Sequence, residues 1–333
     1  TRFPLPRGVA SPSLADVAEP GVLRTILMQC GGEREEILAL KRVSNGTRGR
    51  VDAVEEERLC VLGGADAYHG TILKTAEVFE PRTGEWRPLP QMLVRRTGFV
   101  AGFVAGRIFA CGGFGPHGQM FEHFDPLEQK WRTTPPNTPK LQSPRLRAAG
   151  ATAGGRLYVC GGSDFTSDTV HQSVEYFHPR PADGGGVCSP MSADMLAPRH
   201  VFAAAAIVGP AKTLLLACGG TSTPESQFHA GVSVQAAAEV LDLTDADGSW
   251  RQVAPLARPR MNHAAAALRG NIYVVGGHHG DGLPSFAVER FDGETETWSQ
   301  SPPPPVARLQ PAMTAVGNAL YVLGGVHSFV PGD

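Results

Sequence analysis

Two recurring groups of side chains in this sequence have the chemistry of a binding surface. Arginine follows proline in a short link that recurs along the chain, as in Pro144-Arg145, Pro198-Arg199 and Pro259-Arg260. A guanidinium group forms two parallel hydrogen bonds with a carboxylate, so a ring of arginines suits an acidic peptide or protein loop. Histidine and aromatic residues follow pairs of glycines elsewhere in each copy, and such side chains supply contact area around a charged anchor.

The candidate partner-binding residues come from these two groups. They are Arg95, Arg96, Arg147, His200, Arg260 and Arg308 from the links, and Tyr68, His117, Phe165 and His278 from the loops after the glycine pairs. A structural role is the alternative for each arginine, because a residue that recurs in every unit can instead bond to loop carbonyls or to an acidic residue of the next unit.

No residue pattern predicts metal binding or catalysis. His278 and His279 are adjacent, and neighbouring side chains of an extended chain point in opposite directions, so they do not predict a metal site. The glycines at 184–186 lie in a proline-rich insertion and lack the strand-to-helix context of a phosphate loop. We therefore expect no catalytic residue, no cofactor and no metal.

The elements that must position these side chains repeat along the chain. Ile272–Gly277 is an apolar run rich in β-branched and aromatic residues that ends in two glycines, which indicates a buried strand followed by a turn. Similar runs end in the glycine pairs that begin at Gly31, Gly63, Gly112, Gly161, Gly219, Gly276 and Gly324. From Gly63 onward the period is about 50 residues, which is typical of a β-propeller built of short strands.

Each unit reads as four strands. The innermost is rich in alanine and glycine, as at 263–268, because strands crowd near the axis of a propeller. The second is the apolar run, the third carries a large apolar residue such as Phe124 or Phe291, and the fourth usually carries tryptophan. The large side chains would bury most of the surface between blades. One insertion, at 221–235, is long enough to form a recognition loop.

Counting these units predicts an all-β, six-bladed propeller of four-stranded antiparallel blades. Five complete units span roughly 50–301, and a sixth begins at Pro311 with only its two inner strands. Leftover strands within 22–32 and 36–43 would complete it, so the ring would close by pairing N-terminal with C-terminal strands. A seven-bladed ring is the alternative, because the first glycine pair also follows an apolar run. Residues 1–21 read as a proline-rich linker and 22–333 as one domain.

Composition argues against nucleic acid and membranes as partners and indicates a reducing compartment. The formal net charge is −2, so no global basic field attracts nucleic acid or an anionic membrane surface. No apolar run approaches the roughly 18 residues of a membrane span. Four of the six cysteines directly precede a glycine pair, where other copies carry leucine or valine, so they read as small core residues of a reducing, cytoplasmic compartment. The N-terminus lacks both an initiating Met and the apolar segment of a signal peptide, so we expect a piece of a longer protein.

The repeated pattern resembles the Kelch repeat family. The marks are the glycine pair after an IYVVGG-like strand, the later aromatic in SVEYF or AVERF, the tryptophan after a polar turn, and the Pro-Arg link. The resemblance covers about 22–325 and implies a propeller that binds proteins. Many members are the substrate-recruiting part of BTB–Kelch adaptors for cullin-type ubiquitin ligases, and others are cytoskeletal or scaffold proteins. The chain shows no BTB-like helical segment, so a ligase context would depend on domains outside it.

The main expectation is therefore a non-enzymatic adaptor or scaffold that binds a protein partner, for example an acidic peptide segment, around the central channel. One alternative is a propeller enzyme acting on a small molecule such as a sugar, as in a mutarotase. Another is a regulatory Kelch domain tethered to a catalytic domain outside this chain. The copper radical oxidase type of Kelch enzyme needs a tyrosine cross-linked to cysteine. Tyr158, Tyr273 and Tyr321 lie in apolar strands, which argues against that type.

Overall fold

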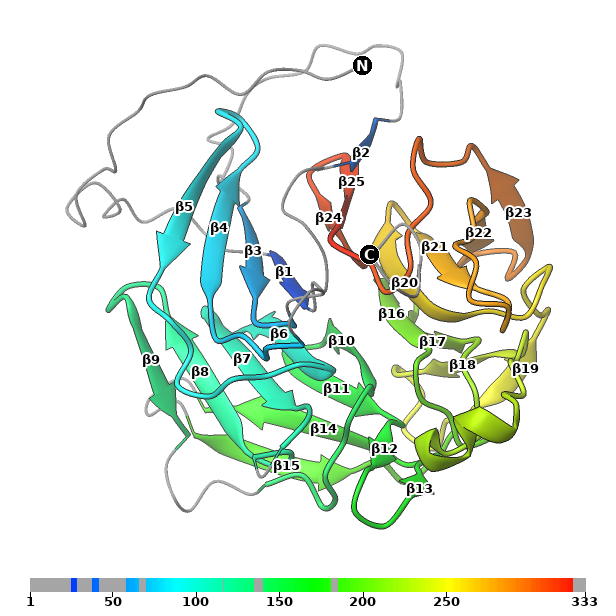
Figure 1. Cartoon of the computed structure of the whole chain (residues 1–333), viewed down its shortest axis with the longest axis horizontal. Coiled ribbons are helices and arrows are strands. Elements are labelled where there is room, and N and C mark those ends of the chain that lie inside the picture. The colour runs from blue at the N-terminus through cyan, green and yellow to red at the C-terminus, as the bar shows by residue number, and fades with distance from the viewer. Residues whose placement is uncertain are drawn as a thin grey trace.

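The computed structural model describes the strands at 25–28 and 38–41 and residues 58–65, 70–115, 117–134, 140–180 and 185–325. These residues form β-strands and one short 3₁₀ helix, η2 (Glu225–Ala230), with no α-helix among them. None of the helical structure in the described part of the chain is long and apolar enough to cross a membrane. The sheets are arranged around a ring, with the inner strands toward its centre (Figure 1).

Five of the sheets are four-stranded blades, each ordered from the inside of the ring outward. Blade 1 consists of β1 (Thr25–Met28), β3 (Leu59–Leu62), β4 (Ala76–Glu80) and β5 (Glu85–Leu89). Blade 2 consists of β6 (Phe99–Val104), β7 (Arg107–Gly112), β8 (Phe121–Asp125) and β9 (Lys130–Thr133). Blade 3 consists of β10 (Ala149–Ala153), β11 (Arg156–Cys160), β14 (Val174–Pro179) and β15 (Gly186–Pro190), with a separate hairpin of β12 (Ser163–Asp164) and β13 (Thr169–Val170). Blade 4 consists of β16 (Ala203–Val208), β17 (Thr213–Cys218), β18 (Ala238–Asp242) and β19 (Arg251–Val253). Blade 5 consists of β20 (Met261–Leu268), β21 (Asn271–His278), β22 (Val288–Asp292) and β23 (Trp298–Ser301).

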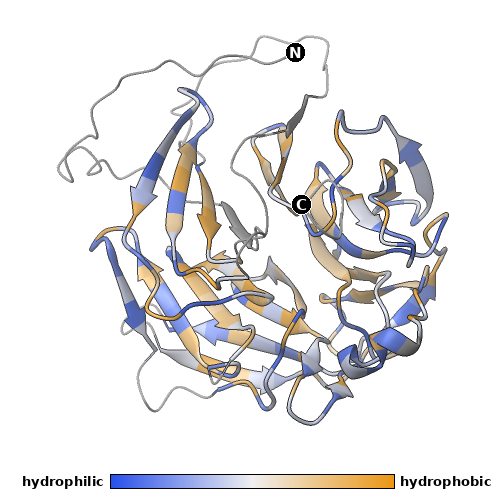
Figure 2. Ribbon diagram, viewed as in Figure 1, coloured by the Kyte–Doolittle hydropathy of each residue, from blue (hydrophilic) through white to orange (hydrophobic). Residues whose placement is uncertain are grey.

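The second strand of each blade is the apolar run identified in the sequence. In blade 5, β21 pairs with β20 on one side and β22 on the other, and Ile272, Val274 and Val275 are at most 1% exposed. Both faces of this strand are covered by neighbouring blades, so it is a continuous apolar run rather than an alternating one. Hydropathy falls from the orange second strands toward the bluer outer strands (Figure 2).

The prediction of six four-stranded blades is wrong, and so is the seven-bladed alternative, because the structure has five blades. The remaining sheet has three strands, β24 (Ala312–Val316), β25 (Ala319–Leu323) and β2 (Leu38–Lys41). Residues 58–89 supply only three strands to blade 1, and β1 fills its innermost position by pairing in parallel with β3. That parallel pair also departs from the expected all-antiparallel blade. The N-terminal segment therefore sends one strand to blade 1 and only β2 to the C-terminal sheet, where it pairs with β25.

The three-stranded sheet occupies the space between blade 5 and blade 1. Its strand β24 packs against both β20 and β1. Val316 and Leu323 join Leu59 and Phe79 of blade 1 in one apolar cluster, and the rings of Phe79 and Tyr321 lie 6.1 Å apart. This partial sheet thus covers the faces of both neighbours.

In blades 1, 2 and 5 the third strand carries phenylalanine and the fourth carries tryptophan, as the sequence predicts, and the two rings lie against each other within the blade. The ring centroids are 5.0 Å apart in Phe79–Trp86, 5.4 Å in Phe124–Trp131 and 5.2 Å in Phe291–Trp298. Blade 3 has no tryptophan, and there Phe177 stacks at 4.4 Å on Phe121 of blade 2. The missing tryptophan is therefore offset by an aromatic contact between blades.

The cysteines described by the structure are free thiols, and those at the ends of second strands are buried core residues, as expected. Cys111, Cys160 and Cys218 are each 0% exposed, and so is Cys60, which lies inside β3. Burial raises the pKa of the Cys111, Cys160 and Cys218 thiols to about 12, so they remain protonated and unreactive at neutral pH. Cys30 lies outside the described residues.

A buried histidine makes the stability of blades 4 and 5 depend on pH. His263 Nε2 lies 3.1 Å from the carbonyl oxygen of Cys218, and burial, with a smaller contribution from Arg260, lowers its pKa from 6.5 to about 3. The unfolded chain therefore binds a proton near pH 6.5 that the folded protein does not bind until about pH 3. This contribution to stability is complete above pH 6.5 and is lost as the pH falls toward 3.

We expect the His263 contribution to the free energy of unfolding to fall by about 2 kcal/mol between pH 7.5 and pH 5. Urea unfolding at both pH values measures it in the parent and in His263→Gln, which does not titrate. The variant should lose about 2 kcal/mol less than the parent over this interval. Equal losses in the two proteins would contradict the assignment.

Candidate functional site

Two sets of connections meet on one face of the ring, as the sequence predicts. We call this surface the loop face. It consists of the links before each inner strand, at 90–98, 140–148, 191–202, 254–260 and 302–311, and of the loops between second and third strands, at 113–120, 163–173, 219–237 and 277–287. The turns between first and second strands and between third and fourth strands lie on the opposite face.

The arginine of each Pro-Arg link points into the ring rather than out of it. Arg145 Nε donates to Glu175 Oε1 at 3.0 Å, Nη1 donates to the Gly161 carbonyl at 2.7 Å, and Nη2 donates to Ser173 Oγ at 2.7 Å. The other carboxylate oxygen of Glu175 accepts the Gln142 amide at 2.9 Å. Both charged side chains are 1% exposed, so this ion pair is part of the core.

The same ion pair recurs around the ring. The equivalent pairs are Arg96–Glu122 at 2.7 Å, Arg199–Glu239 at 2.5 Å and Arg260–Glu289 at 2.5 Å. Each glutamate is the second residue of a third strand and also accepts a backbone amide of the link, from Leu93, Leu196 or Ala257. The glutamate that recurs in FEHF, VEYF, AEVL and VERF is the sequence signal that identifies the partner of the arginine.

These arginines also connect consecutive blades, because the backbone carbonyl bonds to one blade and the side chain bonds to the next. The Arg199 carbonyl accepts the Gly162 amide of blade 3 at 2.9 Å, and Arg199 Nη1 donates to the Gly219 carbonyl of blade 4 at 3.0 Å. Arg308 is 4% exposed, and its Nη1 donates to the Gly324 carbonyl at 2.8 Å. The structure therefore places three of the predicted binding residues, Arg96, Arg260 and Arg308, in structural positions that a partner does not reach.

A ring of backbone hydrogen bonds surrounds the mouth of the channel. Each bond joins the backbone amide at the start of one sheet to the carbonyl oxygen of the equivalent residue in the preceding sheet. The bonds run from Arg147 to Gly98, from Val201 to Arg147, from Asn262 to Val201 and from Gln310 to Asn262, with N–O distances of 2.7–3.1 Å. All five residues have positive φ, between 49° and 61°, which turns the chain sharply into the inner strand. The mouth is thus built from equivalent positions that differ in side chain.

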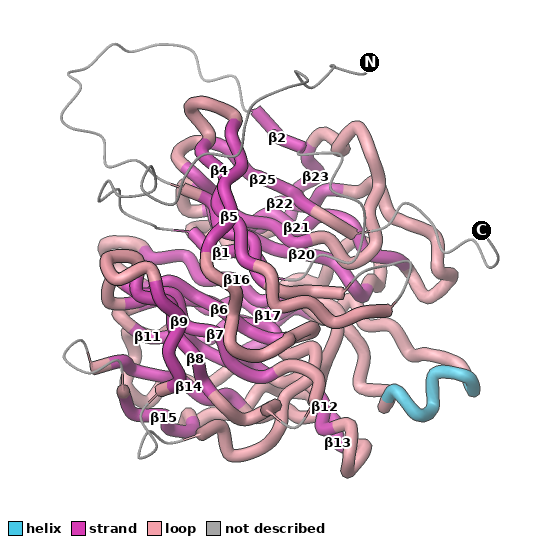
Figure 3. Tube along the Cα trace, turned by 60° about the vertical axis from the view of Figure 1, so that its left-hand side comes forward, coloured by secondary structure: helices cyan, strands magenta, loops and turns pink. Residues whose placement is uncertain are grey.

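The insertion at 221–235 packs against the links that lead into blades 3 and 4. Its 3₁₀ helix η2 stands out from the strands (Figure 3). Glu225 of η2 pairs with Arg147 at 3.2 Å and lies 3.8 Å from His200 Nδ1, and His200 Nε2 lies 2.8 Å from the Thr223 carbonyl. His200 is 0% exposed, and burial lowers its pKa. Both predicted residues, Arg147 and His200, therefore hold the chain's own insertion.

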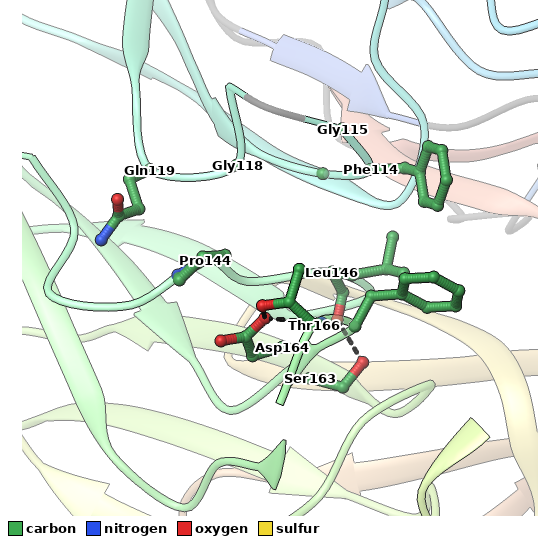
Figure 4. Close-up of a pocket in the computed structure, with 11 residues that line it drawn as sticks. Phe114, Gly115, Gly118, Gln119, Pro144, Leu146, Ser163, Asp164 and Thr166 are labelled. Carbon is green, nitrogen blue, oxygen red and sulfur yellow. Dashed lines mark hydrogen bonds between the residues drawn. The ribbon is translucent and has the colours of Figure 1, made fainter. Parts of the chain in front are cut away.

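A pocket of about 250 Å³ opens on the loop face between blades 2 and 3. Phe114 and Phe165 both line it, in an edge-to-face arrangement with ring centroids 5.6 Å apart. Figure 4 shows Phe114 on one side of the pocket and Leu146, Ser163 and Asp164 on the other. Asp164 Oδ1 accepts the Thr166 amide at 2.9 Å and the Thr166 hydroxyl at 2.6 Å. The lining residues are Gly113, Phe114, Gly115, Gly118, Gln119, Pro144, Leu146, Ser163, Asp164, Phe165 and Thr166.

The family model described as Kelch motif matches residues 58–93, 95–138, 144–180 and 259–305. The chain belongs to the Kelch repeat family. Blade 4, which lies between the last two matched segments, has the same four-strand order as the blades around it. The resemblance expected from the glycine pairs, aromatics and Pro-Arg links is thereby confirmed.

Named relatives of this Kelch chain match it over limited segments. α-Scruin of Limulus polyphemus is 29% identical over 131 residues, which cover 37% of this chain and 14% of scruin. Kelch repeat and BTB domain-containing protein 12 of Danio rerio is 28% identical over 116 residues (32% and 18%), and human Kelch-like protein 35 is 36% identical over 78 residues (23% and 13%). The matched segments thus make up less than a fifth of the length of these three relatives.

A solved structure supports the same fold. The structure of YjhT is 17% identical, covers 71% of this chain and 75% of its own, and superposes with a TM-score of 0.56. At this identity the likeness concerns the propeller architecture alone. Taken together, the Kelch repeats and the Kelch-like relatives support a protein-interaction module as the general function.

The other predicted residues of this Kelch propeller divide into surface and interior positions. Arg95, His117 and Phe165 are exposed on the loop face, and Arg95 donates to the Ile72 carbonyl at 2.9 Å. His278 is buried, and its Nδ1 accepts the Gly280 and Gly282 amides at 3.2 and 3.3 Å, so it shapes its own loop. Tyr68 lies outside the described residues.

The sequence did not single out Phe114, which directly follows one glycine pair, whereas it did single out Phe165, which is the third residue after the next pair. Across the described ranges, no group of three or more His, Cys, Asp and Glu side chains is placed to hold a metal ion.

Proposed function

We propose that this Kelch propeller binds a protein partner through its loop face. The observation that carries the proposal is the distribution of exposed aromatic side chains. Phe114, Phe165 and Phe286 are 44%, 63% and 56% exposed, and all three lie in loops between second and third strands. Phe114 and Phe165 also line the pocket between blades 2 and 3, and exposed aromatic side chains beside a pocket are typical of an interaction surface.

The role of adaptor or scaffold is the more specific part of this proposal. It draws support from a relative whose name combines Kelch repeats with a BTB domain, and a ubiquitin-ligase context would come from segments outside the chain. A cytoplasmic location fits the free, buried cysteines. An acidic segment of the partner would pair with Arg95 and Arg258, which remain exposed on the loop face after the buried arginines are set aside.

The pocket favours binding over catalysis. Asp164 is its titratable side chain, and partial burial alone would raise the pKa of this carboxyl. Hydrogen bonds from Thr166 and Ser167 outweigh the burial and hold the pKa below its usual range. A general acid or base acting near neutral pH needs a pKa close to 7, which this carboxylate lacks. We therefore propose a binding role rather than a mutarotase-like reaction.

Affinity capture from native lysate tests the proposal. The triple variant Phe114→Ala, Phe165→Ala, Phe286→Ala is expected to capture at least about tenfold less of the partner, because it removes three exposed aromatic anchors of the loop face. A matched control carries Leu127→Ala and Val208→Ala, two exposed residues on the opposite face. Thermal melts verify that both variants fold. If the triple variant retained every partner, or the control lost them equally, binding through the loop face would be wrong.

A further inference from the structure

We infer that the pocket between Phe114 and Phe165 receives a basic side chain, lysine or arginine, from the bound partner. This inference rests on the proposed function and names the chemistry recognised at one point of the loop face. It differs from the acidic partner segment expected from the link arginines, because five arginines of the links are buried inside the ring: Arg96, Arg145, Arg199, Arg260 and Arg308.

The size of the pocket suits one side chain. Its volume of about 250 Å³ is below the roughly 300–1,000 Å³ of a site for a drug-sized molecule. Leu146 and Ser163, 7% and 5% exposed, form the buried part of its lining, while the two phenyl rings form the exposed part. An extended residue with an apolar stem and a polar end fits such a site, with the stem against the rings.

The polar side chains of the pocket are acceptors. Gln119 donates its amide group to the Leu141 and Gln142 carbonyls, both at 3.0 Å, which leaves its side-chain oxygen as an acceptor. The Ser163 hydroxyl donates to the Leu146 carbonyl at 3.4 Å. Lysine and arginine are donors with no acceptor atoms, so they match this set, whereas a glutamate would find no free side-chain donor here.

The charge of the pocket also favours a basic side chain. Asp164 is ionised at neutral pH, and no Lys or Arg in the described ranges forms an ion pair with it. The nearby His171 adds no positive charge at pH 7, because burial lowers its pKa. Arg145, which also lies near, is neutralised by Glu175. A cation entering the pocket would therefore meet an uncompensated carboxylate and two phenyl rings, which attract cations through their faces.

Pools of immobilised peptides test the inference. Each pool has one fixed central residue (Arg, Lys, norleucine, Gln or Glu) between randomised uncharged residues, and retention of the fluorescently labelled protein is measured. We expect the Arg and Lys pools to retain about tenfold more protein than the Glu pool, a difference in affinity of about 1.4 kcal/mol. This preference should weaken as salt is raised, because the recognised charge is partly exposed.

Two variants and a control locate the preference. Asp164→Asn keeps an acceptor for the turn that Thr166 closes and should reduce retention on Arg and Lys pools to that of the norleucine pool. Phe165→Ala should lower retention on all three of these pools. Asp247→Asn makes the same charge change at an exposed turn of the opposite face and should leave retention unchanged.

The outcomes separate this inference from the proposed function. Retention on Glu or norleucine pools equal to that on Arg and Lys pools would overturn the basic-side-chain inference and leave the binding function standing. A preference for Arg and Lys that survives Asp164→Asn would also overturn it. If no pool retained the protein and the affinity capture also failed, both would fall.

Discussion

Replacing Arg145 with methionine is expected to lower the free energy of unfolding by about 3–5 kcal/mol. The substitution leaves Glu175 as an unpaired carboxylate that is 1% exposed. It also removes the donors that satisfy the Gly161 and Ser173 carbonyls. Because these groups join blade 3 to the link that leaves blade 2, the damage falls on the contact between blades. Denaturant unfolding followed by tryptophan fluorescence measures the change.

Arg95→Met is the matched control for this prediction. Arg95 lies in the same kind of link but is exposed, so its replacement should change the free energy of unfolding by no more than about 0.5 kcal/mol. The double variant Arg145→Met, Glu175→Gln removes the stranded charge and should be less destabilised than the sum of the single variants. If Arg145→Met were as mild as Arg95→Met, the internal role of the link arginines would be wrong.

Gly161→Ala is expected to destabilise the protein by about 3 kcal/mol or more, from backbone strain together with steric overlap. Gly161 has a φ of +56°, where alanine is strained. A Cβ atom there would lie closer than 3.0 Å to the Arg199 carbonyl oxygen, which already accepts the Gly162 amide. Since Met195 and Phe202 also approach to 3.0 Å, the link cannot withdraw without loosening the contact between blades 3 and 4.

Gly154→Ala separates the two causes. Gly154 has nearly the same φ, +53°, but a Cβ atom added there would meet no other atom within 4 Å. It should therefore show only the conformational cost, about 1–2 kcal/mol. Thermal melts of the two variants compare them directly. Equal losses would mean that close approach of the link contributes nothing and that left-handed geometry alone requires glycine at position 161.

The glycine pair and the link arginine thus act together in the contact between consecutive blades. The pair turns the chain tightly enough for the next link to pass over it, and the arginine of that link reaches into the following blade. Residues repeated in every unit maintain the ring, whereas the candidate binding residues, Phe114, Asp164, Phe165 and Phe286, occupy loop positions that differ between units. A search for function in a repeat protein therefore gains from setting the repeated residues aside.

Residue patterns alone were enough to predict the all-β class, the four-strand unit, the buried cysteines and the loop face. These follow from local patterns, because apolar runs that end at glycine pairs specify buried strands wherever they occur. The sequence also suggested two roles for the link arginines, partner binding and hydrogen bonding within the ring, and did not distinguish between them. The choice depends on Glu175 and its equivalents, which lie about 30 residues away from their arginines and approach them only when the sheet forms.

The blade number and the pocket on the loop face depend on contacts between distant parts of the chain. A short strand carries little information about which edge it will join, so the sequence could not show that β1 pairs in parallel with β3 while β2 pairs with β25. The pocket at Phe114 and Phe165 arises because the loops of two blades come together across a distance of about 50 residues in the chain. Contacts of that kind depend on the curvature of the ring, which brings equivalent loops of successive blades side by side.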